Sequence, residues 1–175
     1  EQSIGQFIGV LDVLQKLHDL DIIHRDIKPS NLLIAKNGTL QLADFGIAHV
    51  ADTNKMLTTT GAVIGSLAYM SPEQRSGRSE PSAQSDLYSL AITMAEALVG
   101  EPMFDLFATR QTDRLRRLVP KPLADILLKA AAYETKSRYQ TAKEMVAELT
   151  QLPENTGVQR FPTDSFGVVA IDPAL

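Results

Sequence analysis

The sequence predicts a mainly α-helical domain with one small β-hairpin. Apolar residues recur at helical spacing in four stretches, at residues 3–20, 87–100, 122–132 and 142–149. Asn37-Gly38 lies between two runs of alternating apolar and polar residues, as is typical of a tight hairpin turn. A chain of 175 residues is long enough to bury a hydrophobic core, so we expect one domain.

Composition excludes several classes of function. The net charge is −4, whereas nucleic-acid binding usually shows as a basic excess, so no nucleic-acid partner is expected. The chain has no cysteine, which rules out disulfides and thiolate metal sites and suits a reducing cytosol. The longest apolar stretch is too short to span a bilayer and contains Glu96. We therefore expect a cytoplasmic protein, and leave open a membrane anchor outside these residues.

The first elements follow from local pattern. Five apolar residues share one face of the first expected helix: Ile4, Phe7, Ile8, Leu11 and Leu14. A short β-type run is expected at residues 22–24. The hairpin follows within residues 32–45, and a loop rich in Thr, Gly and Ala then occupies about 47–70. Long loops inside compact domains are usually functional.

The second half of the chain is predicted to be helical. The stretch 87–100 is apolar nearly all round, which indicates a helix at the centre of the core. Thr141 and Glu144 form a capping box ahead of the last helix. After Pro153 the pattern lapses. The domain is therefore placed at residues 1–152, and 153–175 is expected to be a tail or linker.

Three short motifs carry the chemistry. "HRDIKPSN" occupies residues 24–31, "DFG" occupies 44–46 and "SPEQ" occupies 71–74. In this order, with a hairpin between the first two, they match the catalytic loop, the metal-binding motif and the end of the activation segment of protein kinases. The chain thus resembles the C-terminal lobe of serine/threonine protein kinases, and its Thr-rich loop is most similar to bacterial members. The whole kinase fold is α+β; the part resembled here is the mainly helical C-lobe.

The resemblance implies roles that these side chains are chemically able to fill. Asp26 would be catalytic, accepting the proton of the substrate hydroxyl, and Lys28 would offset charge on the transferring phosphoryl group. Asn31 and Asp44 would bind Mg²⁺ through oxygen atoms, which hard cations prefer. Leu33 would pack under the adenine of ATP, a role that rests on the family alone. A lone His-Arg-Asp is more often a surface ion pair, but the spacing and partners here favour the catalytic interpretation.

Further residues would regulate or support this site. Kinases with an arginine before the catalytic aspartate are often activated by phosphorylation of the activation loop, so Arg25 would pair with phosphate on Thr58 or Thr60. The alternative is a plain solvated Thr-rich loop. Ser66 takes the position of a threonine that bridges the catalytic aspartate and lysine.

The resemblance also implies structural roles. His24 and Phe45 would stack beneath the active site. Asp86 would bond the backbone of the catalytic loop, and it is also an N-terminal helix carboxylate favoured by the dipole. Glu73 and Arg138 would form a buried ion pair.

Half of a nucleotide site is missing from the sequence. No G-x-G-x-x-G motif occurs, nor any strand with a phosphate-pairing lysine, so the kinase N-lobe is absent. Either this is a fragment or the natural chain is truncated. Three functions compete: an active kinase that uses ATP and Mg²⁺ on a protein substrate, a catalytically silent kinase-like module that binds a partner, and a small-molecule phosphotransferase of related fold. Without an N-lobe, an exposed apolar face would favour self-association.

Overall fold

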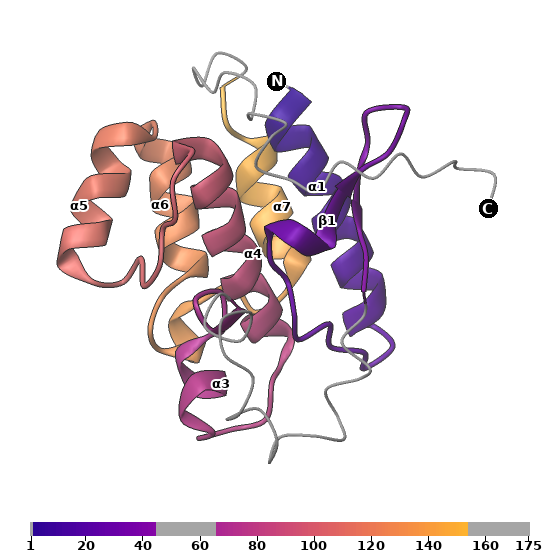
Figure 1. The fold of residues 1–175 in the computed structure, drawn as a ribbon, viewed down its shortest axis with the longest axis horizontal. Helices are drawn as coiled ribbons and strands as arrows, with labels where there is room; N and C mark the ends of the chain where they lie inside the picture. Colours follow the sequence, from indigo (N-terminus) through magenta and orange to yellow (C-terminus); the bar gives the residue numbers. More distant parts are fainter. Residues whose placement is uncertain (1, 45–65, 154–175) are drawn as a thin grey trace.

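The computed structural model describes residues 2–44 and 66–153, and the expected helix-rich architecture is confirmed there (Figure 1). The elements are α1 (Gln2–His18), η1 (Pro29–Asn31), β1 (Leu32–Ile34), β2 (Leu40–Leu42), α3 (Pro72–Ser76), α4 (Ala83–Val99), α5 (Thr109–Leu118), α6 (Lys121–Ala130), η3 (Thr135–Ser137) and α7 (Ala142–Thr150). Within these ranges no helix has both the length and the apolar character that crossing a bilayer requires. Most of the Thr-rich loop and of the expected tail lies outside the described residues.

Helix α1 buries the apolar face that its spacing predicted. Phe7, Leu11 and Leu14 are fully buried, and the helix packs against α7, α4 and strand β2. It ends at His18, and Asp21 then adopts a left-handed backbone with φ 58°. The strand expected at residues 22–24 is wrong. The Ile22 N–H bonds back to the Leu17 carbonyl at 2.9 Å, and a strand requires a partner strand, which this segment does not have among the described residues.

The hairpin forms where the sequence predicted it. Strands β1 and β2 are antiparallel, with Leu33 opposite Gln41 in the register. Its turn is longer than a two-residue Asn-Gly turn, because the Ala35 N–H bonds the Thr39 carbonyl at 2.9 Å around three residues. Gly38 alone in this turn has a positive φ, 83°, as in three-residue hairpin loops.

Helix α4 lies in the middle of the molecule, between the hairpin side and the α5–α6 side (Figure 1). Twelve of its seventeen residues are buried, in agreement with the apolar pattern on all its faces. Ser82 caps its start in a capping box with Ser85, and Gly100 ends it with φ 77°.

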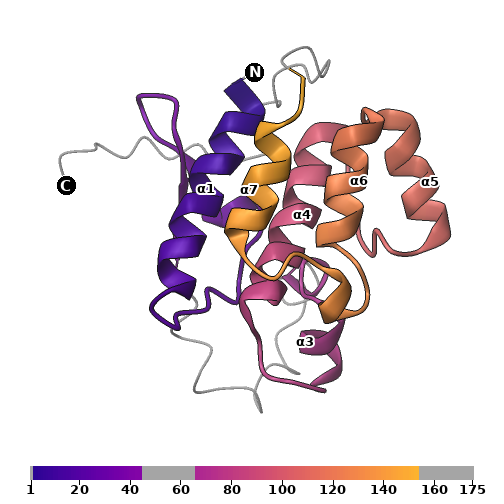
Figure 2. The same ribbon diagram turned by 180° about the vertical axis from the view of Figure 1, so that it is seen from behind.

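Helices α6 and α5 lie on one side of α4, and α7 lies on the other, between α4 and α1 (Figure 2). Helix α6 packs against α4, α5 and α7, and α7 returns to α1. The predicted cap of α7 is present, since the Glu144 N–H donates to Thr141 Oγ1 at 3.2 Å. The Glu144 carboxylate reaches the Gln140 N–H, at 2.9 Å, one residue before the cap.

Candidate active site

The loop between α1 and β1 brings three of the sequence-predicted site residues together. Lys28 Nζ lies 2.8 Å from Asp26 Oδ2 and donates to Ser66 Oγ at 3.0 Å. Asn31 Nδ2 donates to the Asp26 backbone carbonyl at 2.7 Å and to Asp26 Oδ2 at 3.0 Å. Asp26 and Lys28 keep 16% and 21% of their side chains exposed, so solvent reaches the cluster. A carboxylate held beside an ammonium in this way can accept a proton while the ammonium neutralises an anion.

Asn31 and Asp44 are close through the backbone of the hairpin. The Ala43 N–H donates to the Asn31 carbonyl at 2.8 Å, which extends the pairing of β1 and β2 by one residue pair. Ala43 therefore lies opposite Asn31, and Asp44 follows Ala43 directly in the chain. The Asn31 side chain donates to Asp26 through its amide nitrogen, so the amide oxygen Oδ1 takes no part in those bonds. Asp44 is exposed and adopts φ 54°.

This donor set fits a magnesium ion shared with phosphate. Among the described residues, no group of three or more His, Asp or Glu side chains could hold a metal alone. Mg²⁺ commonly takes one or two protein oxygens and completes its shell with water and substrate phosphates. One amide oxygen and one exposed carboxylate match that requirement.

His24 supports the loop from below and is itself almost fully buried. Its Nδ1 accepts from the Asp26 N–H at 3.4 Å, and its Nε2 lies 3.2 Å from the Ala43 carbonyl. Burial lowers the pKa of His24 from its ordinary value, despite the nearby charge of Asp86 and the bond to Ala43. Nδ1 acts as an acceptor here, so the neutral ring fits these contacts.

Asp86 anchors the start of the same loop. Its Oδ2 accepts from the His24 N–H and its Oδ1 from the Arg25 N–H, both at 2.9 Å. Arg25 has φ 72°, a left-handed conformation that is uncommon for residues other than glycine. The hydrogen bond from the Arg25 N–H to Asp86 therefore helps to hold a backbone conformation that an arginine rarely adopts.

Other predicted site residues have simpler positions. Leu33 is half-buried on β1 and points to the face opposite Leu32, which is buried in the core. The Arg25 side chain makes no ion pair with another described residue. Thr58, Thr60 and Phe45 lie outside the described residues.

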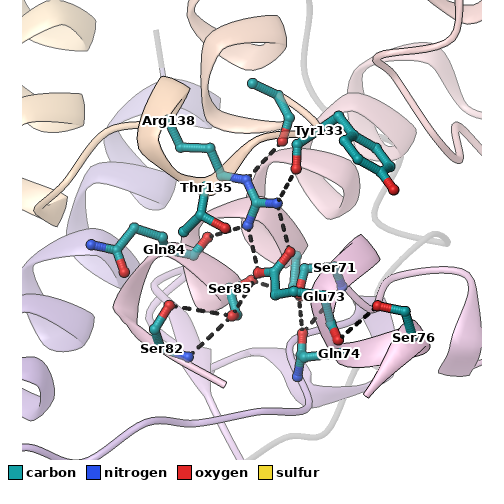
Figure 3. Close-up of polar contacts among 12 residues, drawn as sticks. Ser71, Glu73, Gln74, Ser76, Ser82, Gln84, Ser85, Tyr133, Thr135 and Arg138 are labelled. Carbon is teal, nitrogen blue, oxygen red and sulfur yellow. Dashed lines mark hydrogen bonds and ion pairs between the residues drawn. The ribbon is translucent and has the colours of Figure 1, made fainter. Parts of the chain in front are cut away.

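Glu73 and Arg138 are not part of this cluster; they form an ion pair between α3, which carries Glu73, and the segment between η3 and α7 (Figure 3). The two guanidinium nitrogens Nη1 and Nη2 each lie 2.7 Å from a Glu73 carboxylate oxygen, so the predicted pair is present. Burial alone would raise the pKa of Glu73, but hydrogen bonds from Arg138 and Ser71 lower it to about 2. Ser85 of α4 adds a bond to Glu73 Oε1 at 2.9 Å.

Arg138 uses every donor it has. Beyond Glu73, its guanidinium donates to three backbone carbonyls, those of Ala132 at 2.7 Å, Tyr133 at 3.0 Å and Gln84 at 3.2 Å. An arginine carries five N–H donors, and five hydrogen bonds are made here. The guanidinium also lies 4.9 Å from the centre of the Tyr88 ring.

Sequence reasoning missed His18. Its Nε2 lies 2.9 Å from Asp86 Oδ2, in the same carboxylate that anchors the loop carrying Asp26. A signal was present, because His18 continues the buried face of α1 through Leu11 and Leu14. A histidine on an apolar helix face needs a buried polar partner, but only the fold identifies that partner.

Comparison with known proteins gives consistent matches. The family model described as the protein kinase domain matches residues 2–158. The probable serine/threonine-protein kinase PknB of Corynebacterium glutamicum is 39% identical over 171 residues, covering 88% of this chain and 26% of that protein. PknB of Mycolicibacterium smegmatis is 40% identical over 161 residues, covering 83% of this chain and 26% of that protein. The chain thus spans about a quarter of the length of the curated relatives it matches.

Solved structures agree on the fold. The crystal structure of the Mycobacterium tuberculosis PknI kinase domain has a TM-score of 0.63 and 22% identity, covering 85% of this chain and 53% of that one. A second PknI kinase domain structure, of a single-site mutant, has a TM-score of 0.61 at the same identity and coverage. At this level of identity the likeness concerns the fold alone.

Proposed function

The chain belongs to the protein kinase domain family, and from that premise we propose that it forms the C-terminal lobe of an ATP-dependent serine/threonine protein kinase. The observation that carries the proposal is the contact cluster of Asp26, Lys28 and Asn31 on one loop. The end of helix α7 at Thr150 supports a lobe boundary near residue 152.

Each member of the cluster has a proposed role. Asp26 orients the hydroxyl of a protein serine or threonine and accepts its proton, since its carboxylate is accessible and held by two neighbours. Lys28 stabilises negative charge as it develops on the transferred phosphoryl group, with Ser66 fixing its ammonium. A charged lysine held in place needs little reorganisation during the reaction.

The nucleotide side of the site is proposed from the donor set described above. Asn31 Oδ1 and the Asp44 carboxylate would hold Mg²⁺, and Leu33 would meet the adenine from the open face of β1. Mg·ATP would supply the phosphoryl group, and its Mg²⁺ would offset the negative charge of the phosphates. The remaining contacts to the nucleotide would come from an N-lobe, which we propose as the partner that completes the site.

Regulation is proposed to act through Arg25. Its guanidinium has no carboxylate partner among the described residues, so it is available to a phosphate on Thr58 or Thr60. Mass spectrometry of the full-length protein expressed alone should find phosphate on one of these threonines. Full activity of the double alanine variant without any modification would contradict the switch.

Substitution of Asp26 tests the proposed function in the full-length protein. Asp26→Asn should lower kcat by about 10²–10⁴, the usual contribution of a positioned acid or base, with little change in KM for ATP. The matched control is Asp21→Asn, an exposed aspartate of the same loop whose left-handed backbone asparagine tolerates. Activity of Asp26→Asn equal to that of an active control would overturn the catalytic role of Asp26, whereas no activity in wild type and control alike would favour the silent partner-binding module.

A second substitution tests the proposed magnesium role of Asp44 separately from the proposed base role of Asp26. Asp44→Asn should abolish Mg·ATP turnover while the melting temperature stays within about two degrees, because Asp44 is exposed and outside the core. Asp12→Asn, an exposed aspartate on α1, serves as the control. Unchanged dependence of the rate on magnesium concentration in Asp44→Asn would exclude the metal role.

A further inference from the structure

Helix α5 and the turn after it carry a concentration of positive charge that has no part in the roles described above. Residues 109–121 hold five cationic side chains and one carboxylate, although the net charge of the whole chain is −4. Helix α5 is the outermost helix on its side of α4 (Figure 2). A cluster of one charge on an exposed element of an otherwise acidic chain favours a partner of opposite charge.

Three of the five cations are paired within the chain. Arg114 bonds the carboxylate of Glu101. Asp125 of α6 pairs with Arg116 at 3.5 Å and with Lys121 at 2.6 Å. These contacts account for three side chains without a partner molecule.

Arg110 and Arg117 have no such pairing. Both are exposed, and neither forms an ion pair with another residue that the structure describes. They are seven positions apart, which is almost two turns, so both start from the same face of α5. Asp113, the only acid of the helix, forms no described ion pair with either of them.

The stability of the helix accounts for Arg117 but not for Arg110. Arg117 lies in the last turn, where the helix dipole favours a cation. Arg110 lies in the first turn, at the positive end of the dipole, and that turn contains no acidic residue that would offset its charge. Arg110 therefore adds to the positive potential of this face at a cost to the helix.

We propose that Arg110 and Arg117 form a docking site for an acidic segment of the protein substrate, separate from the serine or threonine that is phosphorylated. The rise of an α-helix puts the two residues about 10 Å apart along its axis. An extended peptide covers about that distance in three residues, so carboxylates at this spacing would reach both guanidiniums. The assignment names a substrate class and rests on the proposed function.

The charge distribution favours a peptide over an anionic membrane surface. A membrane faces a large part of a bound protein, and a chain with a net charge of −4 is repelled by it beyond α5. A short peptide is influenced mainly by charges within a Debye length, about 8 Å at physiological salt. Near Arg110 and Arg117 most of those charges are positive.

Docking at α5 would change substrate affinity and leave the chemical step unchanged. Helix α4 lies between α5 and the hairpin side, so a segment bound at α5 does not cover Asp26 or Lys28 (Figure 1). Binding energy from a remote segment is the same in the ground state and the transition state, which lowers KM and leaves kcat as it was.

Binding of fluorescein-labelled hexaglutamate to the full-length protein, measured by anisotropy, tests the proposal. Wild type should bind hexaglutamate, more weakly as salt rises, and should not bind hexaglutamine. Arg110→Gln/Arg117→Gln should weaken binding about tenfold. The control is Lys136→Gln/Lys143→Gln, which removes the same charge from two exposed side chains outside α5 and should keep wild-type affinity.

Kinetics with a threonine peptide, made with and without a hexaglutamate extension, test the substrate part. The α5 double variant should raise KM for the extended peptide about tenfold and leave kcat unchanged. Its KM for the unextended peptide should equal that of wild type. A loss of kcat in place of a rise in KM would overturn the docking role.

Equal affinity of wild type for the two labelled peptides would overturn the site, and so would equal losses in the α5 and control variants, which would indicate net charge alone. Binding of phosphatidylserine vesicles through Arg110 and Arg117, without binding of hexaglutamate, would overturn it in favour of a lipid surface. Anisotropy requires no phosphate transfer, so intact peptide binding by an inactive protein would contradict the proposed function alone. If the α5 variant does not fold, amide shifts of wild type with hexaglutamate decide: the largest must lie in α5, and largest shifts elsewhere would overturn the site.

Discussion

The Arg138 side chain has none of its surface exposed, and it pairs with a Glu73 side chain that is 10% exposed. All five of its N–H donors are used, and three of the bonds go to backbone carbonyls. Lysine has a single ammonium group and could not reach these positions together. At the scale of single residues, removal of the Arg138 side chain would leave the Glu73 carboxylate and three backbone carbonyls without these donors.

Arg138→Met should therefore lower the free energy of unfolding by about 3–5 kcal/mol, because it leaves the Glu73 carboxylate buried without its partner. Urea unfolding of wild type and variant measures this difference. The control is Lys121→Met: Lys121 is 82% exposed in its pair with Asp125, so we expect a loss below about 1 kcal/mol. Similar losses in the two variants would show that the Glu73–Arg138 pair behaves as a surface pair.

The same pair predicts a dependence on pH. The pKa of Glu73 is lowered from its ordinary value of 4.5 to about 2, so the folded state favours the ionised carboxylate. This stabilisation is complete above the unfolded pKa and is lost as the pH falls through the folded pKa. The stability advantage of wild type over Glu73→Gln should thus shrink between about pH 5 and pH 2, by on the order of 3 kcal/mol. An advantage that stays constant over this range would contradict the assignment.

At the scale of elements, the ends of α4 determine how the site is held. Its first turn contacts three separate segments: the Gln84 carbonyl accepts from Arg138, Ser85 donates to Glu73, and Asp86 accepts from the loop that carries Asp26. Its last turn ends at Gly100, whose N–H bonds the Glu96 carbonyl with φ 77°. A helix with these two defined ends gives the irregular loop a rigid support.

Gly100→Ala tests the end of α4 by backbone conformation alone. A Cβ at Gly100 would meet no atom within 4 Å, so the cost is that of a left-handed alanine, about 1 kcal/mol. Gly9→Ala on α1 is the matched change with the opposite sign. Gly9 is exposed within a helix and also has open space around it, so we expect a gain of about 0.5–1 kcal/mol. Thermal unfolding of the two variants should shift in opposite directions.

The elements also show what the sequence can predict. Helix α4, the cap of α7 at Thr141 and the hairpin position depend on signals within a few residues, and all three were predicted. The strand expected at residues 22–24 was wrong because a strand depends on a partner elsewhere in the chain. His18 was missed for the same reason: its partner Asp86 is distant in sequence, and no local pattern specifies it.

The site residues likewise divide into those that a local pattern predicts and those that depend on partners distant in sequence. Asp26, Lys28 and Asn31 lie on one loop, so their spacing already predicted that they would meet. The Glu73–Arg138 pair came from the family resemblance, since nothing near either residue indicates the other. Metal and nucleotide roles stay predictions, because they depend on groups that these residues would bind rather than on contacts between them.

At the scale of the whole molecule, apolar surface remains where an N-lobe would lie in the proposed kinase. Leu33, Ile4 and Ile8 are half-buried, as expected from the sequence. Apolar side chains with a larger exposed fraction occur elsewhere, including Leu20, which is 70% exposed, and Leu118, which is 56% exposed. Scattered exposed residues are ordinary in soluble domains, so only the face near the hairpin bears on the missing half of the site.

These 175 residues expressed alone should transfer no phosphate. Catalysis of this kind depends on positioning and charge stabilisation at both the acceptor and the nucleotide. The acceptor side is represented by Asp26 and Lys28, but the sequence holds no glycine-rich phosphate loop. Calorimetry should therefore detect little or no ATP binding, and light scattering should show self-association that grows with concentration.

The control for this experiment is the same chain joined to a kinase N-lobe, either in one polypeptide or added as a separate fragment. ATP binding, phosphate transfer and a monomeric state should return together, because one surface serves both the nucleotide and the N-lobe. In that complete form, Asp26→Asn should again lower kcat by about 10²–10⁴ while ATP binding persists. Phosphate transfer by the isolated chain that disappears in its Asp26→Asn variant would show that the nucleotide side is already complete, and that the N-lobe is dispensable.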